Sequence, residues 1–459
     1  MGEVSQTSSC AAVSGGLSSP LLEKKVEGHV SAPALTLNLI NASLGSGALS
    51  LPWAAAGASL MAAAGVMFLV LALNLGTNLI LVVAAERLQI FDLGGLLGKL
   101  PGFWARPLRL FFDVSIWCSV GLTLVGYLVV VSDALAPLGL AKDAGLLLGA
   151  CAVLPLCLMD PKYLAFSSGL SVLANVYLVA LIAFLFLARP QGTNANAAGF
   201  CMLGYGPGLI TMCSALMQSM IFQMCTLPLY ETLQARSVRR FGGCLLASFS
   251  FVFVLFFALC CMSLSLYGED AVASNLLQDL PEDAWGNFAR LGLGLSVLAV
   301  YPIYLESMVA PLKHAEARAQ RLHHPLQLPS PASSDFESDD VVGTLSARSL
   351  ARAKAQVLGL WLQLPLPASR LAVPAVVLAS ALGGSIAPHL GTCNIMNGAS
   401  QVAAMVGWAP GCAGLFLVGD TGPLWRCLMA ALILFATLMS VVGMMYTDNF
   451  VPEMHCISG

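Results

Sequence analysis

Two hydrophobic stretches of the chain contain residues that can open a membrane helix and expose its backbone to a ligand. The first is an apolar run from about 34 to 57, long enough to cross a bilayer. Within it, Gly45-Ser46-Gly47 lowers the cost of non-helical dihedral angles, and Pro52 leaves the carbonyl of Ala48 without a donor. Free backbone groups are tolerated at membrane depth only beside protein or a water-filled cavity. The run therefore predicts a break that binds a substrate or cation, with close helix packing through small residues as the alternative.

The second stretch runs from Ile221 to Glu231. Pro228 frees the carbonyl of Met224, and polar or polarisable side chains stand where a lipid-facing helix would be aliphatic. If the two breaks fall in the first and sixth spans, they are five spans apart. Two five-helix units in tandem then have opposite membrane orientation, which is typical of secondary transporters built from inverted repeats.

The composition is that of a polytopic membrane protein. Of the 459 residues, 58% are hydrophobic and only 10% are charged, against about a quarter in soluble domains. The net charge of −3 and the lack of a basic cluster with interleaved aromatics argue against a nucleic-acid partner. We expect the lipid bilayer and a small-molecule substrate to be the partners, with no enzymatic nucleophile, base or metal cluster.

Hydrophobicity predicts eleven transmembrane helices. The expected spans are about 34–57, 60–85, 108–131, 144–159, 164–187, 208–233, 243–266, 288–312, 371–388, 400–418 and 424–446. The predicted organisation is a disordered cytoplasmic N-tail (1–33), a first five-helix repeat (34–188), helices six to eight (189–313), a cytoplasmic regulatory loop (314–370), helices nine and ten (371–418), and helix eleven with an exterior C-tail (419–459).

The positive charges predict the orientation. With the N-terminus in the cytoplasm, 18 of the 21 Lys and Arg residues fall on the inner side, and Lys142, Arg189 and Arg290 fall outside. This asymmetry follows the positive-inside rule and supports the span count. The sequence leaves the plasma membrane and a vacuolar or lysosomal membrane open as locations. Cys201, Cys393 and Cys456 lie in or near exterior segments and offer candidates for a disulfide that the sequence cannot pair.

Two motifs resemble those of a known transporter family. "NLINASLGSGALSLPWAAAGAS" is similar to the first-helix motif of the amino acid/auxin permease family, and "MIFQMCTLPLYETLQARSVRRF" resembles its sixth-helix motif. The resemblance covers about residues 34 to 447 and is nearest to the sodium-coupled neutral amino acid branch. It implies an all-α, LeuT-like fold with a five-plus-five inverted repeat, broken helices one and six, and one extra helix.

The resemblance also implies a site for an amino acid. Amides of the first break lie at the positive N-terminal end of a half-helix and suit the carboxylate, and carbonyls of the second break suit the ammonium group. Tyr127 of the third span is a further candidate for the pocket wall, with helix packing as the alternative. The residues predicted to bind substrate are Gly45, Ser46, Gly47, Ala48, Trp53, Phe222, Gln223, Met224 and Thr226.

Asn38 and Asn41 share a helix face, and an amide inside a membrane needs a bonding partner. The resemblance implies that Asn41, beside Ala42, contributes to a sodium site, with an interhelical hydrogen bond as the alternative. In relatives a hydroxyl of the eighth span completes that site. Here Ala299 stands near the expected place and Ser296 lies one turn earlier. Sodium and protons therefore both remain open as the coupling ion, and no other cofactor is expected.

Two acidic residues have candidate roles in transport. Glu306, one turn after Pro302, is a hypothetical carrier of a coupling proton; the alternative is a residue paired at the inner interface. Glu231 matches the acid of the sixth-helix motif and is predicted to anchor a cytoplasmic gate against nearby arginines.

Together these observations predict a secondary active transporter of neutral amino acids that works by alternating access and is coupled to a cation gradient. The alternative from another class is a membrane-embedded amino acid sensor that signals through its cytoplasmic segments.

Overall fold

The computed structural model describes residues 30–44, 46–102, 105–157, 167–188, 201–221, 223–268, 272–323, 368–387, 389–419, 422–446 and 455–457. Most of the predicted N-tail and of the predicted regulatory loop lies outside these residues. Within helices, the side chains of residues 41, 42, 167–170, 303, 306, 307, 310–323 and 368–370 are also outside the description.

Helices follow the order of the predicted spans. The first half contains α1 (Ala32–Ser43), α2 (Gly47–Ala56), α3 (Leu60–Leu88), α4 (Leu93–Leu97), α5 (Ala105–Leu135), the 3₁₀ turn η1 (Ala136–Leu138), α6 (Lys142–Cys157) and α7 (Ser167–Ala188). The second half contains β1 (Gly204–Tyr205), α8 (Gly208–Met220), α9 (Gln223–Glu231), α10 (Val238–Tyr267), α11 (Leu276–Asp279), α12 (Ala284–His323), α14 (Ala368–Ile386), α15 (Leu390–Gln401), the π-helix η3 (Val402–Trp408), α16 (Ala409–Phe416), α17 (Pro423–Met445) and β2 (His455–Cys456).

Six helical segments of the described residues are each long and apolar enough to cross a membrane. They are Leu60–Leu88, Ala105–Leu138, Ser171–Ala188, Gly208–Glu231, Val238–Tyr267 and Pro423–Met445. A strongly bent pair, Leu371–Ile386 and Leu390–Phe416, occupies the places of spans nine and ten. The broken helix α1–α2, the shorter α6 and the long α12 occupy the places of spans one, four and eight.

Both broken helices have the same local design. Each proline lies five residues after the first residue of its half-helix, Pro52 after Gly47 in α2 and Pro228 after Gln223 in α9. The helix is therefore interrupted before the turn that contains the proline, and the proline itself lies within the second half-helix. Because proline has no N–H, the carbonyls of Ala48 and Met224 receive no intrahelical bond close to each opening.

The tenth span differs from the sequence prediction. It begins at Leu390 instead of near residue 400, and the chain bends by 117° between the segments Leu371–Ile386 and Leu390–Phe416. The polar residues of α15 lowered the apparent hydrophobicity of this segment. They are nevertheless buried, because α15 packs against α5 and α8 inside the protein. The eighth span also differs from the prediction. Helix α12 continues to His323, beyond the end that was predicted near Leu312.

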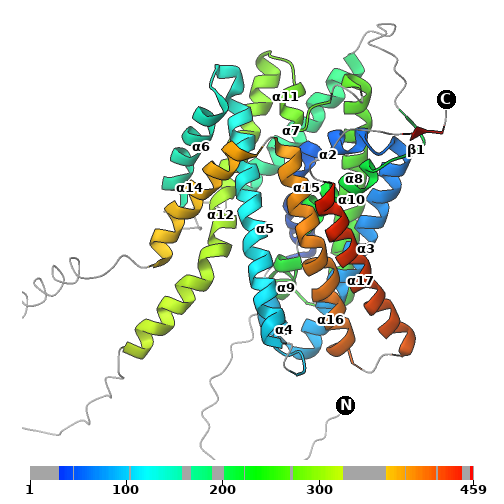
Figure 1. Ribbon diagram of the computed structural model, residues 1–459, viewed down its shortest axis with the longest axis vertical. Helices are drawn as coiled ribbons and strands as arrows, with labels where there is room; N and C mark the ends of the chain where they lie inside the picture. Colours follow the sequence, from blue (N-terminus) through cyan, green and yellow to red (C-terminus); the bar gives the residue numbers. More distant parts are fainter. Residues whose placement is uncertain are drawn as a thin grey trace, which may run out of the picture.

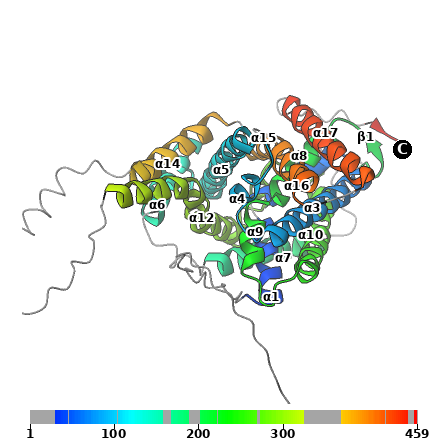
Figure 2. The same cartoon turned by 90° about the horizontal axis from the view of Figure 1, so that it is seen from below.

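The helices form a bundle in which some lie at the centre and the others lie around them (Figures 1 and 2). In the view along the helices, α6, α12 and α14 lie on one side, α3, α16 and α17 lie on the other, and α5 and α15 lie between them. Contacts follow this arrangement: α5 packs against α6, α12, α14 and α15, and α15 packs against α8, α2 and α17. Both broken helices are thus held in the interior, where α2 and α8 contact each other.

A disulfide joins two of the three cysteines predicted to lie in or near exterior segments. Cys201 is bonded to Cys456, with 5.7 Å between the Cα atoms, and Cys393 is buried and free. The bond ties together β1 and β2, which pair antiparallel through Gly204 and Cys456 and through Tyr205 and His455. The segment also covers the start of α3, since Ser59 Oγ donates to the Gly204 carbonyl at 3.2 Å.

The connection between α10 and α12 is folded around one buried arginine. Arg290 is 4% exposed, and its guanidinium donates to the carbonyls of Leu277 (2.9 Å), Leu280 and Pro281 (3.1 Å). The neighbouring Asp279 accepts the Ala273 amide N–H at 2.9 Å. Partial burial raises the pKa of Asp279 to about 6, and the hydrogen bond from Ala273 only partly opposes this effect.

This shift predicts a pH-dependent contribution of Asp279 to stability. Asp279 binds its proton more tightly in the folded protein than in the unfolded chain, so the protonated carboxyl stabilises the folded state. This contribution is complete below the unfolded-state pKa of about 4 and is lost as the pH rises through the folded-state pKa of about 6. Asp279→Asn keeps an acceptor for Ala273 but does not ionise. We therefore expect the melting temperature of the variant minus that of wild type to increase between pH 4 and pH 7. Differential scanning fluorimetry of both proteins in detergent measures this, and a difference independent of pH would contradict it.

Candidate substrate site

The two helix breaks face a common cavity of about 60 Å³. Since one water needs about 10–15 Å³, the cavity holds a few waters or part of a small ligand. Its lining comes from six segments: Ser46 and Gly47 at the start of α2; Ser119, Val120, Thr123 and Tyr127 of α5; Gln218 and Ser219 of α8; Ile221, Met224 and Cys225 of the second break; Tyr304 of α12; and Gln401 of α15.

Three residues predicted to bind substrate line this cavity: Ser46, Gly47 and Met224. Tyr127 also lines it, and its ring meets that of Tyr304 edge to face at 5.4 Å. Ala48 follows Gly47 and is buried. The cavity wall therefore combines backbone from both breaks with side chains from the intervening helices.

Other predicted residues point elsewhere or lie outside the description. Trp53 lies edge to face with His389 at 5.3 Å, away from the cavity, and Ser296 is buried in α12 outside the cavity lining. Asn38 is on the exposed face of α1. The predictions for Gly45, Phe222 and the side chains of Asn41, Ala42 and Glu306 fall outside the described part of the chain.

Ser219 has the arrangement expected of a ligand contact. It is 6% exposed and lines the cavity, and it is one of four described residues with a buried side-chain polar atom lacking a hydrogen-bond partner. A Cβ placed on Gly47 would lie 2.0 Å from Ser219 Oγ, so the absence of a side chain at Gly47 makes room for this hydroxyl. A buried hydroxyl without a partner is costly, and a ligand atom in the cavity would satisfy it.

Amide side chains from other spans bind the carbonyls of the first break. Asn175 of α7 donates to the Leu44 carbonyl at 3.2 Å. Asn394 of α15 donates to the Ser46 carbonyl at 3.2 Å and to Ser50 Oγ at 2.8 Å. Part of the backbone at the break is therefore satisfied by protein, while Gly47 at the start of α2 lines the cavity.

A second group of amides fixes α5, α8 and α15 around the cavity. Asn397 donates to Thr123 Oγ1 at 2.8 Å and accepts from Gln401 Nε2 at 2.5 Å. Gln401 Nε2 also donates to Gln218 Oε1 at 3.4 Å. The sequence analysis missed these residues. Their spacing could have revealed them, because Asn394, Asn397 and Gln401 follow one another at three and four residues and so share a helix face.

Gln223 and Thr226, also predicted to bind substrate, form hydrogen bonds to residues of α3. Gln223 Nε2 donates to Asn74 Oδ1 at 2.8 Å and lies 3.3 Å from Thr77 Oγ1, and Thr226 Oγ1 donates to Asn78 Oδ1. All five residues are nearly or fully buried. These bonds hold the α9 half-helix against α3, so both side chains are placed to position the second break. The four-residue spacing of Asn74 and Asn78 was the available sequence signal.

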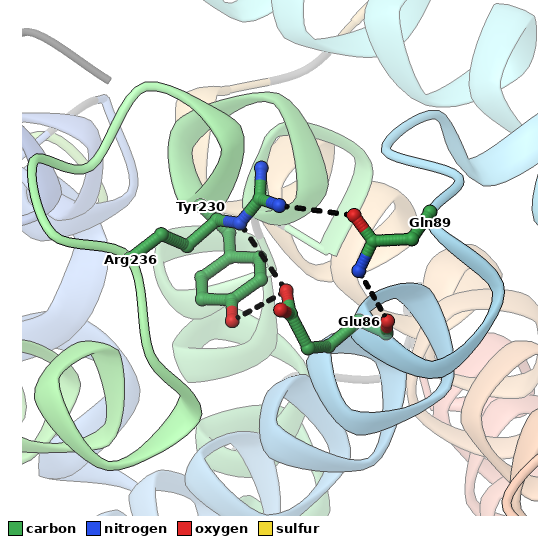
Figure 3. A network of polar contacts seen from close by, with 4 residues as sticks. All are labelled: Glu86, Gln89, Tyr230 and Arg236. Carbon is green, nitrogen blue, oxygen red and sulfur yellow. Dashed lines mark hydrogen bonds and ion pairs between the residues drawn. The ribbon is translucent and has the colours of Figure 1, made fainter. Parts of the chain in front are cut away.

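At the end of the bundle where α9 meets the start of α10, a polar cluster joins α3 to the segment after α9 (Figure 3). Arg236 Nε lies 3.2 Å from Glu86 Oε2, which also accepts from the Tyr230 hydroxyl at 2.8 Å. Arg236 donates to Gln89 at 3.2 Å, and its guanidinium stands 4.1 Å from the centre of the Phe91 ring. The acid paired with this arginine is therefore Glu86, and the half-buried Glu231 lies one residue beyond Tyr230.

We predict that Glu86 and Arg236 stabilise the folded protein together, with a measurable coupling free energy between the two side chains. Its side chains are 36% and 18% exposed, and the Tyr230 hydroxyl strengthens the geometry, so we expect about 1 kcal/mol in a double-mutant cycle of Glu86→Gln and Arg236→Gln. The free energy of unfolding in detergent provides the readout. The exposed pair Arg109–Asp113, at 4.0 Å with side chains 60% and 56% exposed, is the matched control and should show almost no coupling. Equal coupling in the two pairs would refute the prediction.

The arrangement of the helices matches solved transporters. An inward-facing structure of Mhp1 aligns with a TM-score of 0.51 at 12% identity, over 92% of this chain and 90% of that one. A manganese transporter of Eremococcus coleocola aligns with a TM-score of 0.52 at 13% identity, over 93% and 90%. MhsT in complex with L-phenylalanine aligns over 92% and 99% at 13% identity, with a TM-score of 0.46. Among curated proteins no significant match was found.

Helices broken at the first and sixth positions around a buried cavity, in this arrangement, define a multi-pass membrane protein with the LeuT-like fold of secondary transporters. A family model described as transmembrane amino acid transporter protein matches residues 28–447, and the chain belongs to this family. It is therefore a transporter of amino acids and not an enzyme.

Proposed function

We propose that the protein moves small neutral amino acids by alternating access, driven by a cation gradient. The observation that carries the neutral preference is the cavity between the two breaks. Each described residue that lines it is uncharged, so a charged substrate side chain would lose its hydration without gaining a counter-charge. The cavity volume of about 60 Å³ favours a small side chain.

In this proposal the substrate backbone is bound mainly by the protein backbone. The amides of Gly47 and Ala48 lie at the positive end of the ten-residue helix α2 and would bind the carboxylate. The Met224 carbonyl, freed by Pro228, would accept from the ammonium group. Ser219 Oγ would supply a further hydrogen bond to the bound amino acid.

We also propose a cytoplasmic N-terminus, which the excess of basic residues supports. The Cys201–Cys456 disulfide is consistent with it, because the proposal places both cysteines on the exterior or lumenal side, where disulfides persist. The segment 314–370 would then be a cytoplasmic regulatory loop. The plasma membrane and an acidic organelle both remain compatible with this orientation.

Two sites are proposed for coupling, and they differ in the ion. Asn41, Ala42 and Ser296 would contribute to a sodium site, whereas Glu306 would carry a proton. Ser296 is 2% exposed, and a buried hydroxyl is a suitable ligand for a hard cation. A proton-coupled carboxylate would need access to water during the transport cycle.

Uptake into proteoliposomes tests both the function and the coupling. Labelled neutral and charged amino acids are supplied to wild type, Asn41→Ala and Glu306→Gln, with sodium and proton gradients imposed separately. Sodium-driven uptake lost in Asn41→Ala would support the first site, and proton-driven uptake lost in Glu306→Gln would support the second. Folded protein without gradient-driven uptake of any amino acid would overturn the proposed function.

A further inference from the structure

A second cavity, of about 340 Å³, lies between α3 and α17, which Figure 2 shows on the same side of the bundle. We call it the α3–α17 groove. Gly76, Leu428 and Phe435 of its lining are exposed, so it opens on the outer surface of the bundle. Its lining residues are Ala72, Leu73, Gly76, Thr77 and Ile80 of α3 and Leu428, Met429, Ala431, Leu432 and Phe435 of α17.

The groove lies at the depth of the bilayer. Both of its walls belong to segments that are long and apolar enough to cross a membrane, Leu60–Leu88 and Pro423–Met445. Its α3 wall is about 12 Å long at 1.5 Å per residue, compared with about 15 Å for the hydrocarbon of one leaflet. Each lining residue apart from Thr77 is apolar. The groove therefore matches the acyl chains that a bilayer places against this surface.

A glycine and a third helix keep the groove open. No heavy atom lies within 4 Å of the position that a Cβ would take at Gly76. Helix α16 packs against both α3 and α17. A Cβ at Gly414 of α16 would lie 2.5 Å from Met429 Sδ and 3.4 Å from Ile80 Cγ2, so α16 fits closely between the two walls. The separation of the walls is therefore set by α16 and does not require an occupant.

Two arginines stand at one end of the groove. Arg87 follows Ile80 by two helical turns and so shares its helix face, and its guanidinium donates to the Val418 carbonyl just before α17. Arg426 lies in the first turn of α17, and both arginines are exposed. The neighbouring Trp425 is a residue typical of the membrane–water interface. An anionic headgroup at this end would meet positive charge while its acyl chain follows the groove.

The groove also contacts a residue that positions the second break. Thr77 lines the groove, and its Oγ1 lies 3.3 Å from Gln223 Nε2 at the start of α9. Asn74, nearly one turn earlier in α3, accepts from the same Gln223 amide at 2.8 Å. An acyl chain packed against Thr77 would therefore support the face of α3 that holds α9.

We propose that the α3–α17 groove binds one acyl chain of an anionic phospholipid, with the headgroup at Arg87 and Arg426, and that this lipid stabilises the contact between α3 and α9. The inference concerns a lipid and does not depend on which substrate is transported. It predicts one phospholipid that is held more tightly than the surrounding bilayer lipids.

Photo-crosslinking locates the occupant. The purified full chain in phosphatidylcholine nanodiscs receives a phosphatidylserine with a diazirine in one acyl chain, and the labelled residues are identified by mass spectrometry. We expect labelling at 72–80 and 428–435. Gly76→Leu should reduce it about tenfold, because the new side chain takes the place of about two methylenes of the lipid. Gly65→Leu is the matched control and should keep the labelling, because Gly65 is an exposed glycine of the same helix with equally open surroundings and does not line the groove.

Competition identifies the headgroup. Unlabelled phosphatidylserine and phosphatidylglycerol should both displace the probe better than phosphatidylcholine does. Arg87→Gln and Arg426→Gln should each reduce this preference about fivefold. Arg106→Gln changes an exposed arginine of α5, which does not line the groove, and should leave the preference unchanged. Equal displacement by phosphatidylcholine in wild type would overturn the proposal of an anionic lipid.

Thermal unfolding measures the stabilisation. Phosphatidylserine should raise the Tm of wild type and of Gly65→Leu more than that of Gly76→Leu, because a ligand that binds only the folded state stabilises it. An equal rise in all three proteins would overturn the stabilising role.

Two further outcomes would overturn the site. Labelling spread evenly over the lipid-facing helices would show contact with bulk bilayer only. A dimer of wild type that Gly76→Leu dissociates would assign the groove to a second copy of the chain. None of these readouts requires uptake, so a failure of the proposed transport function would leave the lipid site standing.

Discussion

Replacing Gly398 with alanine should abolish transport and sharply reduce the yield of folded protein. A Cβ at this position would lie 1.8 Å from the Ser214 carbonyl oxygen, 2.8 Å from its carbon and 3.0 Å from the Gln218 amide nitrogen. All three atoms are backbone of α8, so no side-chain rotation relieves the overlap. Overpacking usually costs about 1–3 kcal/mol, and we expect about 3 kcal/mol or more here because α15 must move away from α8. Thermal unfolding in detergent and uptake into proteoliposomes provide the measurements.

Gly243→Ala is the matched control. Gly243 is an exposed glycine of α10, and no heavy atom lies within 4 Å of the position that a Cβ would take there. The exchange should therefore be neutral or stabilise the helix by up to about 1 kcal/mol. If Gly398→Ala unfolded at the same temperature as Gly243→Ala, the close contact between α15 and α8 would be refuted.

Asn397→Ala should reduce transport by roughly 5- to 150-fold while the protein remains folded. The change removes the donor to Thr123 Oγ1 and the acceptor for Gln401, and both partners are at the edge of the central cavity. Thr123 keeps its bond to the Ser119 carbonyl, and Gln401 keeps its contact with Gln218. The loss of two hydrogen bonds therefore costs about 1–3 kcal/mol, which corresponds to that range if the cost appears in the organised site. Uptake rates at saturating and low substrate concentration measure the loss.

Ser400→Ala distinguishes this effect from a general weakening of α15. Ser400 lies three residues beyond Asn397 and donates only to the Asn397 carbonyl of its own helix, at 2.9 Å. Its loss should change uptake less than about threefold, because a bond within one helix contributes about 1 kcal/mol or less. Similar defects in Asn397→Ala and Ser400→Ala would argue against a specific role for the amide group.

The sequence was sufficient to predict the fold because its main determinants are local. Apolar runs separated by charged loops indicated the helices, and the glycines and prolines at positions 45 to 52 and at Pro228 indicated the two openings. Even so, Pro52 and Pro228 lie inside the second half-helices and not at the openings. Because proline has no N–H, its position in the sequence shows which carbonyl loses its helical hydrogen bond. The position of the helix break depends in addition on which neighbouring groups form hydrogen bonds with the free backbone.

The lining of the central cavity was predicted only in part because side-chain direction depends on tertiary packing. Ser46, Gly47 and Met224 line the central cavity, whereas Gln223 and Thr226 turn towards Asn74 and Asn78 of α3. Nothing in the local sequence of α9 indicates which of its faces meets α3. The amides of α15 were missed for a related reason, since hydrophobicity alone does not distinguish a polar segment in a loop from one buried inside the protein.

The most direct test of the central claim uses the native thiol of Cys225, which lines the cavity between the two breaks. Proteoliposomes are treated with a membrane-impermeant thiol reagent from either side, with and without each amino acid, and modification of Cys225 is measured by mass spectrometry. We expect a transported amino acid to protect Cys225 and a non-transported one to leave it reactive. Transport without any protection of Cys225 would show that substrate binds elsewhere and would contradict the assignment of this cavity.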